Sequence, residues 1–231
     1  MTENNILHEV VENRNDRRIL VVGDTHGQIE ALEEALSYAR FTPEDGDFLI
    51  MLGDLIDRGY GSKETLDFAI ELVESGHGIV LRGNHEQMAL DAYASNNFKH
   101  WFDNGGEVTH NQIQGSANYI NFMKSLPFVC QIGSILFVHA GFKPNISLDK
   151  QDPNDMIWIR EEYIYGNVFP DQIIFTGHTP VQCFTDNDPQ PVCITNKIFI
   201  DTGAAYGKRG GFVTVCDMMF DNIWSAKCIT K

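Results

Sequence analysis

The chain has 231 residues, of which 43% are hydrophobic and 21% are charged, and its formal net charge is -15. This composition indicates a globular protein with a sizeable core and excludes a disordered chain. A binder of bulk nucleic acid usually carries a basic surface, so we expect no nucleic-acid polymer as a partner. Because no apolar run approaches the roughly 20 residues that cross a bilayer, we expect no membrane partner either.

The N-terminal segment and the cysteines favour a cytoplasmic protein. Residues 1–17 are polar and mixed in charge, unlike a signal peptide, and are expected to be an irregular lead-in with a short strand or helix at 6–11. The five cysteines are odd in number, and no two of them have CxxC spacing. Reduced thiols are therefore expected in place of a disulfide framework.

Short β-branched runs alternate with helical patterns in the first hundred residues. The predicted strands cover residues 18–23, 47–52 and 78–82, and the predicted helices cover residues 28–40, 62–75 and 86–95. Ser62 and Gly76 are interpreted as the N-cap and C-cap of the middle helix. This order predicts a parallel α/β sheet with right-handed crossovers.

The middle of the chain, residues 96–126, lacks this alternation and is rich in aromatic side chains. We interpret it as a helical cap inserted into a single catalytic domain that spans residues 18–231. Trp101 and the turn at Gly105 and Gly106 are interpreted as packing within the cap and not as a binding site.

The last part of the chain is rich in strand patterns and has no linker long enough to separate two domains. The predicted strands cover residues 128–132, 134–139, 173–176, 192–195, 197–201, 211–217 and 222–230. The Asp-Asn pair at 221–222 predicts a hairpin turn between the last two of these strands.

Potential metal ligands follow the ends of three consecutive predicted strands. Residues 23–27 are Gly-Asp-Thr-His-Gly, residues 53–59 are Gly-Asp-Leu-Ile-Asp-Arg-Gly, and residues 83–86 are Gly-Asn-His-Glu. Two later strands lead into His139 and His178. Ligand sites in open α/β sheets form beyond the carboxyl ends of the strands, so we expect these loops to converge. The glycines permit tight turns and close backbone approach.

The convergent set contains two aspartates, one asparagine and three histidines, namely Asp24, His26, Asp54, Asn84, His139 and His178. Mixed oxygen and imidazole ligands suit Mn, Fe or Zn better than Ca. Six side chains exceed what one open catalytic ion needs, and they suit two ions about 3.5–4 Å apart with one carboxylate bridging them. A single Gly-Asp is usually part of a turn, and a lone buried histidine is usually a hydrogen-bonded core residue. Five strand ends in register, each with a potential ligand, are not explained by turns and core hydrogen bonds alone.

These motifs resemble the signature of the phosphoprotein phosphatase family of metallophosphoesterases. The resemblance extends from about residue 18 to residue 211 and includes His-Ala-Gly at 139–141 and Gly-His at 177–178. The compact size and Trp-Ile-Arg at 158–160 are most similar to its bacterial and phage serine/threonine protein phosphatases. The resemblance implies an α/β fold in four αββα layers, with two mixed β-sheets flanked by helices.

The resemblance also implies a role for each motif residue. The first of two divalent metal ions would be bound by Asp24, His26 and Asp54, and the second by Asp54, Asn84, His139 and His178, with Asp54 bridging. His85 would be the general acid and Asp57 its orienting partner. Arg58 and Arg160 would bind phosphate oxygens, and Asn84 and Tyr206 are further candidates for substrate contact. We expect Mn, with Fe or Zn as alternatives, and a metal-activated hydroxide as the nucleophile.

Three of these assignments have alternatives. Asp57 could instead be a loop-stabilising partner of Arg58. Arg160 could instead form a surface salt bridge, and Tyr206 could instead be a packing residue. The chain also lacks the Ser-Asp-Pro segment that larger eukaryotic relatives carry before the second arginine, and residues 201–206 replace their substrate-facing loop. The histidines outside the motifs are expected to be structural or exposed, namely His8, His77, His100 and His110.

Three functions fit the motifs. The first is hydrolysis of phosphoserine and phosphothreonine in proteins, with phosphotyrosine as a further substrate. The second is symmetrical hydrolysis of a dinucleoside polyphosphate such as diadenosine tetraphosphate, which uses the same metal motifs. The third is a non-catalytic phosphate-binding module, which the intact Asp54, His85 and arginines argue against. The expected partner is therefore a phosphorylated protein or a small phosphoester, and the motifs do not choose between them.

Overall fold

The computed structural model describes residues 8–12 and 17–229, and most of the predicted lead-in lies outside these residues. Its strands form a five-stranded sheet of order β11-β10-β2-β3-β4 and a six-stranded sheet of order β1-β5-β6-β7-β9-β8. The bounds are β1 His8–Val10, β2 Ile19–Val22, β3 Phe48–Met51, β4 Gly78–Val80, β5 Val129–Ile132, β6 Ile135–Val138, β7 Ile173–Thr176, β8 Val192–Ile194, β9 Lys197–Phe199, β10 Phe212–Asp217 and β11 Ile223–Lys227. Strand β1 falls within the segment predicted as a short strand or helix.

The parallel unit predicted from the first hundred residues is confirmed, and two further strands make its sheet mixed. Strands β2, β3 and β4 are parallel, with Val21 opposite Ile50 and Ile50 opposite Ile79. Strand β10 pairs antiparallel with β2, and β11 pairs antiparallel with β10. The carboxyl ends of the parallel strands therefore all lie at one edge of the sheet.

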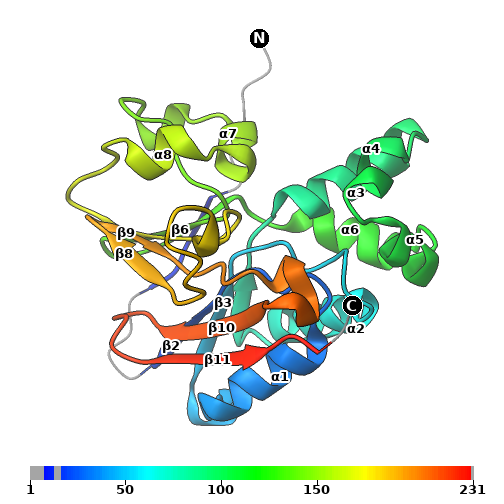
Figure 1. The fold of residues 1–231 in the computed structure, drawn as a ribbon, viewed down its shortest axis with the longest axis horizontal. Coiled ribbons are helices and arrows are strands. Elements are labelled where there is room, and N and C mark those ends of the chain that lie inside the picture. Colours follow the sequence, from blue (N-terminus) through cyan, green and yellow to red (C-terminus); the bar gives the residue numbers. More distant parts are fainter. Residues whose placement is uncertain (1–7, 13–16, 230–231) are drawn as a thin grey trace.

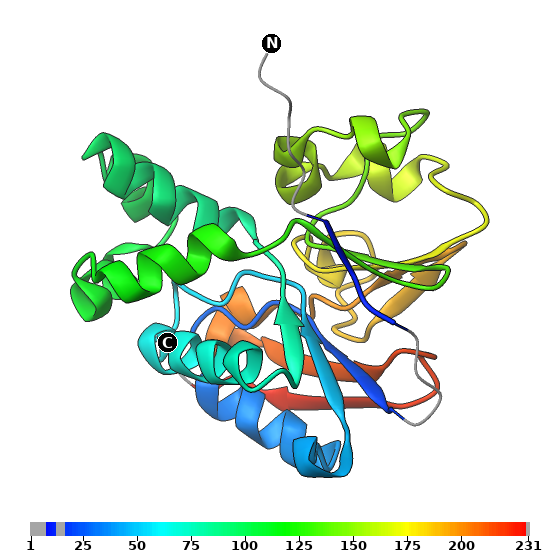
Figure 2. The same ribbon diagram turned by 180° about the vertical axis from the view of Figure 1, so that it is seen from behind.

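The helices include the three predicted in the first hundred residues and three in the cap. Their bounds are α1 Ile29–Tyr38, α2 Ser62–Glu74, α3 Asn84–Ser95, α4 Lys99–Asp103, α5 Glu107–Ile113, α6 Ala117–Ser125, α7 Pro153–Trp158 and α8 Glu161–Tyr165. Helices α3 to α6 project together from one side of the molecule (Figures 1 and 2). Within the described ranges, every helix is too short or too polar to cross a membrane.

The prediction that Ser62 is the N-cap of α2 is wrong. Gly61 occupies that position, and Ser62 is the first residue of the helix. The Ser62 hydroxyl instead accepts hydrogen bonds from the Asp57 backbone N–H at 3.0 Å and from the Thr109 hydroxyl at 2.9 Å. The serine is therefore used to join a loop of the predicted site to the cap.

The four-layer arrangement follows from the alternation of apolar side chains along fully buried strands. In β2, Leu20 packs on the helix side of the sheet, and Val21 packs between the two sheets. On the outer face of the second sheet, Phe199 packs with Ile157 of α7 and Tyr163 of α8. Helices α1 and α2 thus cover one sheet, and α7 and α8 cover the other (Figure 1), so the predicted αββα fold is confirmed.

Candidate metal centre

The six predicted ligands meet at the edge where both sheets end. Asp24 and His26 follow β2, Asp54 follows β3, and Asn84 begins α3 just after β4. The second sheet contributes the remaining two, because His139 follows β6 and His178 follows β7. Each of the six is at most 4% exposed. The predicted convergence of the strand ends is therefore confirmed, although the ligands are drawn from two sheets.

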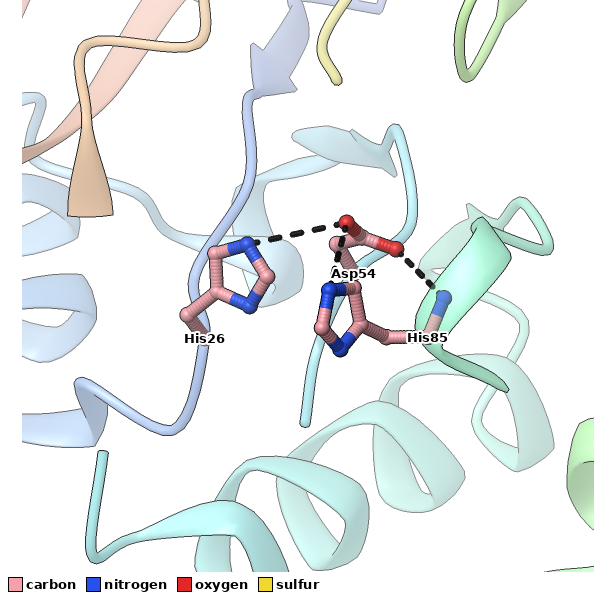
Figure 3. Close-up of side chains that lie close together, drawn as sticks. All are labelled: His26, Asp54 and His85. Atoms are coloured by element: carbon pink, nitrogen blue, oxygen red, sulfur yellow. Dashed lines mark hydrogen bonds and ion pairs between the residues drawn. The ribbon is translucent and has the colours of Figure 1, made fainter. Parts of the chain in front are cut away.

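Asp54 lies at the middle of this set. Its carboxylate is 3.6 Å from His26 Nε2 and 3.4 Å from His139 Nε2. Asp54 belongs to two groups of potential ligands, and within each group the ligand atoms lie within 4.8 Å of one another. The first group is Asp54 with His26 and His85, and the second is Asp54 with His139 and His178. Figure 3 shows the first group, in which the carboxylate faces both imidazole rings. This geometry fits two adjacent cations that share one carboxylate.

The three histidines predicted as ligands are held in the same way. One ring nitrogen of His26, His139 and His178 hydrogen-bonds to a backbone carbonyl oxygen, at 3.0, 2.9 and 3.3 Å respectively. The other nitrogen faces the centre, which is the usual arrangement of a metal-binding imidazole. Burial is the main reason that the pKa of each ring is lowered. The neutral imidazole, which is the form that binds a metal, is therefore favoured.

His85 differs from these three histidines in its partner and in its pKa. Its Nδ1 hydrogen-bonds to Asp57 Oδ2 at 2.6 Å, so a carboxylate takes the place of the carbonyl. Burial lowers the pKa of His85, but the carboxylates of Asp54 and Asp57 outweigh burial and raise it. The surroundings of His85 therefore favour a protonated ring, which suits a proton donor.

Three carboxyl groups are buried close together at the centre and repel one another when they are ionised. Burial raises the pKa of Asp24 well above its ordinary value, and the charges of Asp201 and Asp54 raise it further. Asp201 itself is 1% exposed, and burial raises its pKa to about 6. Three carboxyl groups with mutual repulsion, surrounded by neutral imidazoles, form a donor set that fits bound divalent ions.

Two glycines allow the ligand carboxylates to lie directly on neighbouring loops. Asp54 Oδ1 accepts the His85 backbone N–H at 3.0 Å, and Asp24 Oδ1 accepts that of His178 at 3.0 Å. A side chain at Gly83 would collide with Asp54 Oδ1, and one at Gly177 would collide with Asp24 Oδ1. The motif glycines are therefore required by close approach, as their spacing predicted.

Several predicted site residues have a strained backbone. Of the thirteen non-glycine residues with positive φ in the described chain, five belong to the site, namely His26 at 45°, Asp54 at 50°, Asp57 at 75°, Arg58 at 70° and His178 at 65°. Such a conformation costs on the order of 1–3 kcal/mol per residue and persists only where the surroundings enforce it. The clustering supports a functional role for these loops.

The two arginines lie at the exposed rim above the buried ligands. Arg58 Nη1 is 3.1 Å from His26 Nε2, and Arg160 Nη1 donates to the Thr179 hydroxyl at 2.9 Å and to the His178 carbonyl at 3.2 Å. They therefore flank the centre beside two different ligands. The described contacts of Arg160 do not match its alternative interpretation as a surface ion pair. Tyr206 is 41% exposed, so it is accessible from solvent.

Glu86 has a supporting position that the sequence reasoning did not assign. Its carboxylate is fully buried and accepts the backbone N–H groups of Asp54, Leu55 and Gly83 at 3.0, 2.8 and 2.9 Å. Burial, followed by the charge of Asp54, raises the pKa of Glu86 to about 7. The available signal was the acidic residue at the fourth position of the Gly-Asn-His-Glu motif, directly after a buried strand.

Trp101 is the second residue whose position the sequence reasoning missed. Its ring is buried among aromatic side chains of the cap, as predicted, but its Nε1 also donates to Asp57 Oδ2 at 2.7 Å. No local pattern indicated this contact, because Trp101 and Asp57 are 44 positions apart.

Comparison with known proteins agrees with the fold and the motifs. The family model for calcineurin-like phosphoesterases matches residues 17–201. The chain is 33% identical over 214 residues to serine/threonine-protein phosphatase 1 of Salmonella typhimurium, covering 87% of this chain and 93% of that protein. It is 36% identical over 224 residues to serine/threonine-protein phosphatase 2 of Escherichia coli K12, covering 86% and 93%. The chain belongs to the calcineurin-like phosphoesterase family, and the predicted resemblance to its phosphoprotein phosphatase branch is confirmed.

A solved structure provisionally assigned as a diadenosine tetraphosphatase has the same fold. It aligns with a TM-score of 0.75 over 96% of this chain and 98% of that chain, at 18% sequence identity. At this identity the likeness concerns the fold alone. The family match and the two protein phosphatases place the chain among hydrolases that act on phosphoesters.

Proposed function

We propose that the protein is a serine/threonine protein phosphatase that works with two divalent metal ions, Mn being the first candidate and Fe and Zn the alternatives. The observation that carries the proposal is the buried Asp54 carboxylate, shared by two groups of ligand atoms. Asp24, His26 and Asp54 bind one ion, and Asp54, Asn84, His139 and His178 bind the other. Residues 18–231 act as one catalytic domain with a cap at 96–126.

The residues around the centre divide the remaining tasks. Bound divalent ions supply Lewis acidity toward water and the phosphoryl oxygens. Arg58 and Arg160 present fixed positive charge from two sides and orient the phosphate. His85 holds a proton on its ring and delivers it to the leaving oxygen, and Asp57 stabilises the charged ring from the opposite nitrogen. Asn84 and Tyr206 are the remaining candidates for substrate contact.

Two observations support a phosphorylated protein as the substrate. The two relatives described above, at 33% and 36% identity, are named serine/threonine-protein phosphatases and align over 93% of their length. The two arginines are exposed while the ligands below them are buried, so a phosphate on a protein surface can reach them. The tetraphosphatase likeness, at 18% identity, supports the fold and carries no weight for the substrate.

A substrate panel tests this proposal. The purified protein, loaded separately with Mn, Fe or Zn, is offered a phosphoserine peptide, a phosphothreonine peptide, a phosphotyrosine peptide and diadenosine tetraphosphate at equal concentration. We expect the first two peptides to be hydrolysed with the highest kcat/KM, and Mn to give the highest rate. Turnover of the nucleotide alone would contradict the proposed substrate class while leaving the phosphoesterase activity intact.

A further inference from the structure

The cap reaches the proposed general acid through one hydrogen bond from Trp101. Its Nε1 donates to Asp57 Oδ2 at 2.7 Å, and His85 Nδ1 hydrogen-bonds to the same oxygen at 2.6 Å. All three residues are at most 1% exposed. A tryptophan of helix α4 is therefore connected to the imidazole of His85 by a single carboxylate oxygen in a buried part of the protein.

The second carboxylate oxygen of Asp57 does not share this task. Asp57 Oδ1 is buried and has no hydrogen-bond partner within the described parts of the chain. The orientation of the carboxylate thus depends on the two bonds at Oδ2, and a bond to an ionised oxygen in a dry site is stronger than one between neutral groups. If the indole N–H is removed, the hydrogen bond to His85 alone fixes the orientation of the Asp57 carboxylate, which can then rotate.

The cap also fixes the backbone that carries Asp57. The Asp57 N–H donates to the Thr109 hydroxyl of α5 at 3.0 Å, and the Arg58 N–H donates to the Gly105 carbonyl at 3.3 Å. A side chain at Gly106 would collide with the indole of Trp101. Gly106 therefore leaves room for the indole within the cap, and Gly105, whose Cβ would lie 2.9 Å from Arg58 Cγ, permits close contact with the loop that carries Asp57.

We propose that Trp101 is a positioning residue for the proton-donating pair of His85 and Asp57, and that the cap acts on catalysis through its indole N–H. This inference rests on the proposed function, because it assumes that His85 protonates the leaving group. Trp101 orients Asp57, Asp57 orients His85, and of these three residues only His85 touches the substrate. The role predicted for Trp101 from the sequence, packing in the cap, accounts for its burial but not for this hydrogen bond.

Leaving-group dependence separates this role from simple packing. Phenylalanine at position 101 removes the indole N–H together with part of the ring, and it keeps an aromatic side chain in the cap. For Trp101→Phe we expect kcat for phenyl phosphate, whose leaving group needs a proton, to fall by about tenfold. For 2,4-dinitrophenyl phosphate, whose leaving group needs none, we expect a fall of less than about twofold. KM for both substrates is expected to change little, because the arginines and metal ligands are untouched.

Trp224 provides the matched control, because it lies in β11 and is partly buried in the helix-side core. We expect Trp224→Phe to leave the ratio of the two rates unchanged. Equal losses with both substrates in Trp101→Phe would overturn the inference and assign Trp101 to packing alone. Hydrolysis of neither substrate by the wild-type protein would contradict the proposed function instead, which keeps the two failures distinguishable.

A spectroscopic measurement tests the hydrogen bond without any activity. In metal-free protein labelled with ¹⁵N, the indole N–H resonance of Trp101 is compared between the wild type and Asp57→Asn. Because a charged acceptor deshields the proton more than a neutral amide does, we expect the signal to move upfield in the variant, while those of Trp158 and Trp224 stay in place. An unmoved Trp101 signal would overturn the inference, even if Trp101→Phe does not fold.

Discussion

At the scale of single residues, the four histidines of the centre share their burial and differ in what holds them. His26, His139 and His178 are held by backbone carbonyls and have lowered pKa values, whereas His85 is held by a carboxylate and has a raised one. A carbonyl accepts a hydrogen bond from a neutral ring, but a carboxylate also stabilises a charged ring. This difference is the physical basis for the proposal that three of these histidines are ligands and that His85 is the acid.

His85→Asn tests this separation, because His85 also lies within reach of Asp54 as a possible ligand. If His85 is the acid, we expect kcat for phenyl phosphate to fall by about 10²–10⁴ while the protein still binds two ions per chain. Metal content measured by plasma spectrometry, alongside the rate, decides the matter. A variant that binds only one ion would assign His85 to the metal ligands.

Glu86 gives a prediction on pH. Its pKa is raised by burial, and then by Asp54, from 4.5 to about 7, so the folded chain holds this proton more tightly than the unfolded chain does. Its contribution to stability is present below pH 4.5 and is lost as the pH rises through about 7. We expect metal-free wild type to lose on the order of 1–3 kcal/mol of unfolding free energy relative to Glu86→Gln across this window.

Urea denaturation of both metal-free proteins at about pH 5 and about pH 8 measures this effect. Relative to the wild type, Glu86→Gln should have a higher free energy of unfolding at the higher pH than it has at the lower pH. A difference that is independent of pH would mean that Glu86 does not titrate in this range. In that case the three backbone N–H groups that donate to Glu86 would keep its carboxylate ionised throughout this pH range.

The proposed ligands could be predicted from the sequence because all six follow predicted strands, and all but His139 stand next to a glycine. The glycines that let the carboxylates of Asp24 and Asp54 approach neighbouring loops are Gly177 and Gly83, which belong to two other motifs of the same set. Trp101 was not accessible in this way, because it meets Asp57 only after the cap folds back over the loop. Local spacing carries no information about such a contact.

At the scale of elements, strands were predicted more fully than short helices. Buried β-branched runs specify strands such as β2 and β3 directly, and their bounds deviate from the prediction by one residue at each end. Helices α7 and α8, which cover the second sheet, were not predicted. They contain six and five residues, which is too short for a helical repeat of apolar residues to be recognised.

The contact between the cap and the Arg58 loop gives a prediction about two glycines. Gly105 has φ of 97°, and a Cβ there would lie 2.9 Å from Arg58 Cγ, whereas Gly76 has φ of 75° and nothing within 4 Å. Alanine at either position costs about 1–2 kcal/mol of stability, because the left-handed backbone is strained. Only Gly105→Ala also displaces Arg58, so we expect it alone to raise KM for a phosphoester by several-fold.

Gly76→Ala is the matched control for backbone strain in this experiment. Steady-state kinetics and thermal unfolding of both variants provide the comparison. The interpretation of the cap as a support for Arg58 would be contradicted if both variants lost stability equally and KM stayed the same in each.

At the scale of the whole molecule, the net charge of -15 predicts a preference among phosphopeptides. A negative field repels acidic substrates and attracts basic ones, and salt screens both effects. For one phosphoserine sequence flanked by lysines or by glutamates, we expect kcat/KM at low salt to be about tenfold higher with lysines. The ratio should approach one at about 0.5 M salt. A ratio that does not respond to salt would exclude a long-range electrostatic origin.

The proposed function requires that the buried Asp54 carboxylate bind two cations at once. A titration of chelator-stripped protein with Mn²⁺, in which bound metal and the rate of aryl phosphate hydrolysis are followed together, tests this requirement. We expect the rate to reach its maximum when two ions are bound per chain, and Asp54→Asn to abolish both the binding of the second ion and the activity. A maximum at one bound ion, or hydrolysis that persists without metal, would contradict it.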